Sequence, residues 1–66
     1  MASNTRGKLK ENFEGMHRNF DWIIYHCQKS LALIQEHNPK LSDAVKSLGE
    51  ATNTLDELAQ GIYKKL

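Results

Sequence analysis

Two stretches of heptad-spaced apolar residues, separated by His37-Asn38-Pro39-Lys40, most constrain the fold of this 66-residue chain. In each stretch the apolar positions recur at alternating steps of four and three residues, which is typical of one face of a helix that packs in a supercoiled pair. The first stripe is Leu9, Phe13, Met16, Phe20, Ile23 and Cys27, and the second is Leu41, Val45, Leu48, Thr52, Leu55, Ala59, Ile62 and Leu66. The pattern predicts an all-α fold, an antiparallel two-helix hairpin.

Local signals set the expected bounds of the two helices within a single domain, residues 1–66. Any residue from Ser3 to Thr5 can cap the first helix, which we expect to run from about residue 4 to 36, because the residue before a proline disfavours helix. After a turn at 37–38, the second helix runs from about residue 39 to 65. Asn38 is a good N-cap, and Pro39 suits the first helical position.

A tight connection makes the helices antiparallel, and residues that face each other then have numbers that sum to about 75. This register predicts that Cys27 faces Leu48 and is a small buried hydrophobe. Every apolar stripe residue gains an apolar partner, except that Ile23 faces the polar Thr52.

Self-association is expected because so small a hairpin buries little core, and its single cysteine cannot form an internal disulfide. A second row on the 39–65 helix carries small residues that let another helix approach closely. We therefore predict an oligomer interface, in a four-helix bundle of two hairpins or a larger helical oligomer. The alternative is that a long helix simply contains many small residues. The row is Ala44, Ser47, Ala51, Thr54, Leu58 and Gly61.

A second row on the first helix combines aromatic and basic residues and is a candidate partner or ligand surface. Trp, Tyr and Arg are enriched where proteins bind one another, and aromatic rings between cations could also stack on a small anionic, nucleotide-like ligand at subunit boundaries. Alternatively, the rings complete the oligomer core with their polar tips at its rim. The row is Arg18, Trp22, Tyr25 and Lys29.

The chain carries nine basic and eight acidic residues, a balance unlike that of a dedicated nucleic-acid module. The antiparallel arrangement nevertheless gathers basic residues at the open end of the hairpin, a candidate anion-binding end: Arg6, Lys8, Lys10, Lys64 and Lys65. The chain is similar in size and architecture to small RNA-binding four-helix bundles of the Rop type, although no RNA-contacting motif matches residue by residue. The resemblance implies nucleic-acid binding by the basic end as an alternative function.

Catalytic and metal-binding patterns are lacking in the sequence. His17, His26 and His37 are too far apart to chelate one ion within a helix, and the scattered glycines form no phosphate-binding loop. No apolar run is long enough to span a bilayer, and we expect a cytoplasmic protein with no cofactor. The sequence favours a small non-enzymatic oligomeric interaction protein, a regulator or inhibitor of a macromolecular partner. We expect this partner to be a protein rather than nucleic acid or a small anionic ligand.

Overall fold

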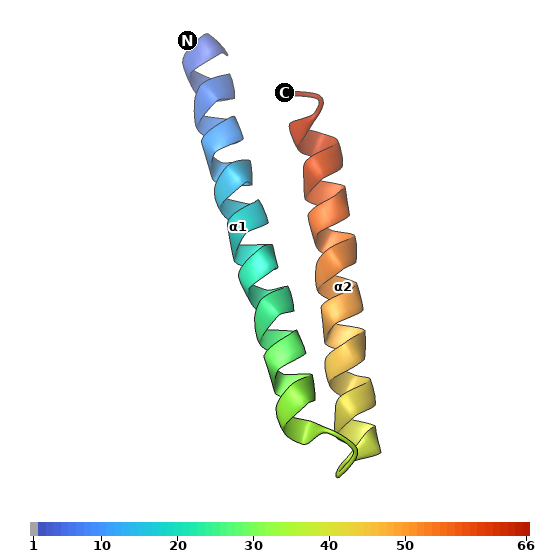
Figure 1. Cartoon of the computed structure of the whole chain (residues 1–66). Helices are drawn as coiled ribbons and strands as arrows, with labels where there is room; N and C mark the ends of the chain where they lie inside the picture. The colour runs from blue at the N-terminus through green and yellow to red at the C-terminus, as the bar shows by residue number, and fades with distance from the viewer. Residues whose placement is uncertain (1) are drawn as a thin grey trace.

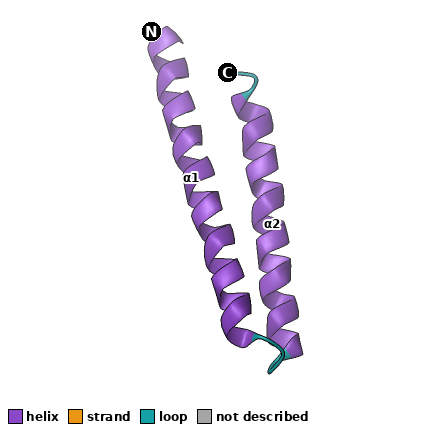
Figure 2. Cartoon of the chain, in the orientation of Figure 1, coloured by secondary structure: helices purple, strands orange, loops and turns teal. Residues whose placement is uncertain are grey.

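The computed structural model describes residues 2–66 as two long helices packed side by side (Figure 1). Helix α1 spans Ala2–Ile34 and helix α2 spans Pro39–Tyr63. A short connection reverses the chain, so that both termini lie at the same end of the molecule (Figures 1 and 2). The hairpin is elongated, with principal extents of 55 × 15 × 11 Å. The predicted all-α antiparallel hairpin is confirmed.

The turn is built largely as the sequence predicts. The Asn38 side chain caps α2 by accepting a hydrogen bond of 3.1 Å from the Leu41 amide, and Pro39 occupies the first helical position. Helix α1 ends at Ile34, two residues earlier than expected, because Gln35 adopts the left-handed conformation with a φ of 52°. A residue in that conformation ends a helix in the manner of a C-terminal cap.

The outer ends of the helices differ from the predicted bounds. Helix α1 begins at Ala2, so Asn4 and Thr5 lie inside the helix, and the prediction that either is its cap is wrong. Helix α2 ends at Tyr63 rather than at residue 65. Met1 lies outside the described residues.

Contacts between the helices confirm the predicted register. The site of a Cβ atom on Gly49 lies 3.8 Å from Cβ of Cys27, and the side chains of His17 and Asp56 are hydrogen bonded. The Tyr63 hydroxyl donates a hydrogen bond to Glu14. In each contact the residue numbers sum to about 75.

The rotation of α2 about its own axis differs in part from the predicted one, since Thr52 and Ala59 are buried as predicted whereas Leu48 and Leu55 are exposed. Its most buried residues are small or polar: Ser42, Thr52, Asp56 and Ala59. From α1, Cys27 is buried beside Gly49, and Phe13, Phe20 and Leu31 are half-buried. The line along which the two helices meet, here called the seam, therefore contains one row of large apolar side chains from α1 and a row of small or polar ones from α2.

The prediction that the leucines of α2 face α1 is consequently wrong. Leu48 is 54% exposed and Leu55 is 53% exposed. Gly49 and Asp56, each one position further along the chain, occupy the seam instead. Small side chains there let the two backbones approach, and the polar ones find partners, since the Thr52 hydroxyl donates to the Leu48 carbonyl at 2.8 Å. No described buried side-chain nitrogen or oxygen lacks a hydrogen-bond partner.

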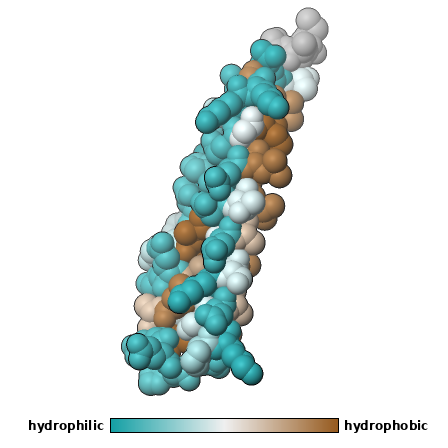
Figure 3. Space-filling view, turned by 90° about the vertical axis from the view of Figure 1, so that its right-hand side faces the viewer, coloured by the Kyte–Doolittle hydropathy of each residue, from teal (hydrophilic) through white to brown (hydrophobic). Residues whose placement is uncertain are grey.

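The displaced apolar side chains gather on one side of the hairpin. Each lies four residues before a residue of the seam, as Ile23 does before Cys27 and Leu48 before Thr52. These side chains therefore occupy the same heptad position in both helices. In helices of opposite direction, equivalent heptad positions flank the seam on the same side. Figure 3 shows apolar side chains along one edge in the upper half of the molecule and smaller apolar patches between hydrophilic side chains lower down. This apolar face comprises Leu9, Met16, Ile23, Leu41, Leu48, Leu55 and Ile62, which are all exposed.

Replacing Gly49 with alanine should stabilise the hairpin. The new Cβ would lie at ordinary contact distance from Cys27, 3.8 Å from its Cβ and 4.0 Å from its Sγ, and alanine favours a helix over glycine by about 0.8–1 kcal/mol. We expect Gly49→Ala to raise the free energy of unfolding by about 1 kcal/mol in urea denaturation. Gly61→Ala is the matched control, because nothing lies within 4 Å of its Cβ position. A loss of stability in Gly49→Ala alone would show that the seam is tighter than described.

Candidate functional site

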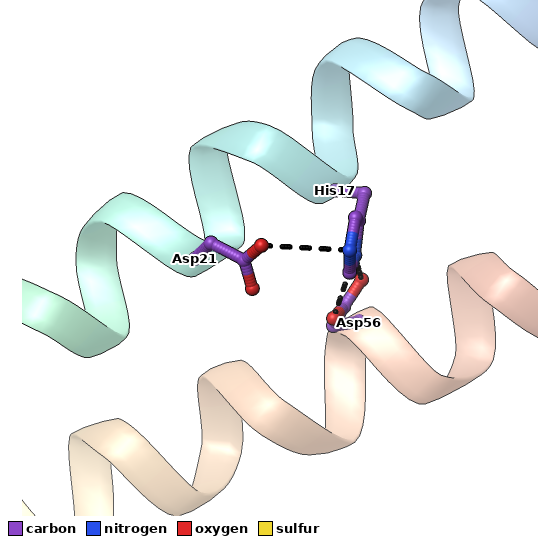
Figure 4. A group of neighbouring side chains, drawn as sticks. All are labelled: His17, Asp21 and Asp56. Atoms are coloured by element: carbon purple, nitrogen blue, oxygen red, sulfur yellow. Dashed lines mark hydrogen bonds and ion pairs between the residues drawn. The ribbon is translucent and has the colours of Figure 1, made fainter.

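The most organised group of polar side chains is formed by His17 and Asp21 of α1 and Asp56 of α2 (Figure 4). Nδ1 of His17 lies 2.8 Å and 3.0 Å from the two carboxylate oxygens of Asp56. Its Nε2 lies 3.4 Å from Oδ2 of Asp21, which is one helical turn further along α1. Because an ionised carboxylate can only accept hydrogen bonds, Nδ1 carries a proton and donates it toward Asp56.

Burial differs sharply within this cluster. The Asp56 side chain is 12% exposed, whereas those of His17 and Asp21 are 44% and 62% exposed. The hydrogen bond to Asp56 raises the pKa of His17, and burial lowers it by a smaller amount; the charges of Asp21 and Asp56 raise it further. The balance favours an imidazolium that joins α1 to α2 through the contact of Nδ1 with Asp56, while its Nε2 contacts Asp21 on the same helix.

The sequence analysis did not predict this cluster, although the sequence contains two indications of it. The register places His17 near Asp56, since their numbers sum to about 75, and His17 and Asp21 are neighbours at a spacing of four on a helix. Spacings among the three histidines alone do not indicate this cluster, because its other two members are aspartates. The potential ligand atoms of the three side chains all lie within 4.8 Å of one another.

The predicted partner surface of Arg18, Trp22, Tyr25 and Lys29 lies on α1 and is exposed. Trp22 is 59% exposed and stacks on His26, with 5.6 Å between ring centroids and an angle of 24° between the planes. Tyr25 meets Trp22 edge to face, and Nζ of Lys29 lies 5.5 Å from the Tyr25 ring centroid. His26 was not predicted to belong to this surface, although its spacing of four from Trp22 favours contact.

A shallow hollow of about 390 Å³ lies on this surface between Arg18, Asp21, Trp22 and Tyr25. It offers ring faces and one guanidinium, but the Asp21 carboxylate also lines it. A negative charge in the hollow opposes a small anion, whereas a protein partner can pair with Arg18 and Asp21 together. The residues that line the hollow are therefore better suited to bind a protein partner than a nucleotide.

The predicted anion-binding residues lie at the open end of the hairpin, where both termini are found (Figure 1). Four of them are exposed: Arg6 and Lys8 on α1, and Lys64 and Lys65, which follow the last residue of α2. The fifth, Lys10, is half-buried. Within residues 4–66, no acidic side chain forms an ion pair with any of these five.

The predicted oligomer row on α2 is exposed throughout, and it points away from α1. Three of its members, Ala44, Ala51 and Leu58, lie beside the leucines of the apolar face, because each follows one of them by three residues. Ser47, Thr54 and Gly61 lie further from that face. The structure thus places half of the row next to the exposed leucines.

Comparison with protein-family models, with curated proteins and with solved structures finds no match. Neither described helix combines the length and apolar character that crossing a membrane requires.

The stability of the hairpin should fall as pH rises through the raised pKa of His17. Unfolding returns His17 to an ordinary pKa of about 6.5, so the bridge contributes fully below that pH, and its contribution is lost as pH increases through the folded-state value. We expect the urea midpoint to be lower at about pH 8.5 than at about pH 6. The difference should shrink in His17→Gln, with His37→Gln as the control. An unchanged pH dependence in His17→Gln would contradict this assignment.

Proposed function

We propose that this chain is a small non-enzymatic interaction protein that works as a homo-oligomer, with two hairpins forming a four-helix bundle. The observation that carries the proposal is the apolar face, in which seven large side chains between 39% and 54% exposed lie together on one side. In a bundle, each helix packs against two neighbours, so part of its apolar surface is left uncovered when one hairpin stands alone.

The accessible area supports a second copy as the occupant of this face. The chain exposes 5339 Å², whereas a compact monomer of this size exposes roughly 4,200 Å² by the usual scaling. The excess of about 1,100 Å² per chain is close to the area of about 800 Å² that each partner buries in a stable interface. Twofold dimers are the most common way to cover such a face.

The opposite side of the hairpin favours this orientation of the second copy. On that side, the positions next to the seam carry charged or amide side chains, which remain hydrated when a second copy covers the apolar face. The uncharged apolar face and the polar side thus differ as the inside and outside of a bundle do. The polar side comprises Glu14, Asp21, Gln28, Lys46, Asn53 and Gln60.

We further propose that the bundle binds a protein partner through Arg18, Trp22, Tyr25 and Lys29. Trp22 lies on the outer side of α1, about 100° around the helix from the row of Ile23, so covering the apolar face leaves it accessible. Trp, Tyr and Arg are the residue types that most often dominate protein interfaces, and this surface exposes one of each. Binding of such a partner would make the protein a regulator or inhibitor.

Self-association should depend on Leu48 and not on its neighbour Ser47. At micromolar concentration, light scattering should report at least twice the mass of one chain. Leu48→Lys removes about 2 kcal/mol of apolar burial per chain and places a charge in the interface. We expect this variant to dissociate or to melt at a lower temperature that depends on concentration.

Ser47→Lys is the matched control, since Ser47 is exposed and lies away from the apolar face. It should keep the wild-type mass and melting temperature. A wild-type chain that is monomeric and melts at a concentration-independent temperature would refute the proposed assembly. Dissociation by Ser47→Lys alone would instead favour the row of Ala44, Ser47 and Ala51 as the interface.

Trp22 should remain accessible in the oligomer. It is the only tryptophan, so its fluorescence reports this surface alone, and we expect red-shifted emission that acrylamide quenches readily. Trp22→Ala should leave the oligomer mass unchanged and lower the melting temperature by only a few degrees, because it removes an exposed side chain. Blue-shifted, protected emission, or dissociation of Trp22→Ala, would place the indole in the oligomer core instead.

A further inference from the structure

His17 is held in one orientation by a nearly buried carboxylate. Both oxygens of Asp56 contact Nδ1, at 2.8 Å and 3.0 Å, and Asp56 is only 8% exposed. Since Nδ1 donates its hydrogen to Asp56, the nitrogen left to act as a ligand is Nε2, which binds an ion after it releases the proton that it carries in the imidazolium. A carboxylate on the far nitrogen is the usual partner that orients a metal-binding histidine and increases its basicity.

A second carboxylate lies beside the free nitrogen. Oδ2 of Asp21 is 3.4 Å from Nε2 of His17, and the two residues are one helical turn apart on α1 (Figure 4). Zinc binds imidazole nitrogen at about 2.0–2.1 Å and carboxylate oxygen at about 2.0–2.2 Å, so two such ligands in a tetrahedral site are about 3.4 Å apart. The observed separation therefore needs little side-chain movement to accept one ion.

The surroundings leave room for the other ligands. The side chains of His17 and Asp21 are 44% and 62% exposed, so an ion can enter from solvent and keep water in its remaining positions. Asp21 belongs to the polar side of the hairpin, opposite the apolar face. Covering the apolar face with a second copy would not close this site.

We propose that Nε2 of His17 and the carboxylate of Asp21 bind a divalent cation of the zinc class, with Asp56 as the positioning residue. Imidazole and carboxylate ligands together favour zinc over magnesium, which prefers oxygen ligands alone. The site does not use the apolar face through which two copies would associate, but its ligand Asp21 also lines the hollow of the partner surface.

The test is a titration of the untagged chain with zinc chloride, followed by calorimetry and by the NMR signals of the His17 ring. We expect one ion per chain and a shift of the His17 signals that magnesium chloride does not reproduce. Asp21→Asn removes one ligand oxygen from an exposed residue and should weaken binding at least tenfold. Asp56→Asn should weaken it by about 10–100-fold through the loss of the orienting carboxylate.

Asp43→Asn, which neutralises an exposed carboxylate elsewhere on α2, and His26→Gln are the matched controls. Both should bind zinc as the wild type does. Equal affinity in Asp21→Asn and Asp43→Asn, a His17 signal that zinc leaves unchanged, or an equal response to magnesium would each overturn the proposal. If Asp56→Asn fails to fold, as judged by circular dichroism, the comparison of Asp21→Asn with its controls still decides the question.

Discussion

The narrow seam between the two helices determines where the other side chains of the hairpin can lie. Two helices share a single line of contact, and α2 places small or polar residues along it, including Ser42, Gly49 and Thr52. The large apolar residues of α2 are therefore turned to one side, where α1 presents apolar residues at the same heptad position. An isolated hairpin cannot bury that side, because no third helix is present to cover it.

The polar groups in the seam matter more for the choice of one helix register than for the free energy of unfolding. A buried ionic pair is weak evidence for a large stabilisation, and its best-attested role is to select one register. The contact of His17 with both oxygens of the nearly buried Asp56 carboxylate is the pair in this seam to which such a role would fall. Sliding α2 by a heptad would leave the nearly buried Asp56 carboxylate without its partner, whereas the apolar contacts would be exchanged for similar ones.

Much of the hairpin follows from local signals. The heptad stripes, the Asn38 cap and Pro39 together predict two helices and their register, and the structure confirms these. The rotation of α2 could not be predicted in the same way, because the stripe was centred on the large apolar residues. That choice assumes that the apolar side of α2 faces α1, whereas a helix with two neighbours divides its apolar surface between them. Leu48 and Leu55 belong to the part that faces away from α1.

The same assumption explains why the candidate site was only partly predicted. A stripe that contains Leu55 places Asp56 outside the predicted contact between the helices. The sequence then gives His17 no predicted partner on α2. The row of Trp22 and Tyr25 was predicted from sequence as a candidate partner surface, with the oligomer core as the alternative. Its residues share one side of α1, which spacing along a single helix predicts without knowledge of α2. Surface sites on a single helix can thus be predicted from spacing alone, whereas a site shared between helices requires the rotation of each. For this hairpin, the rotation that brings Asp56 to His17 also turns the leucines of α2 outward, so the polar cluster and the apolar face have a common structural origin.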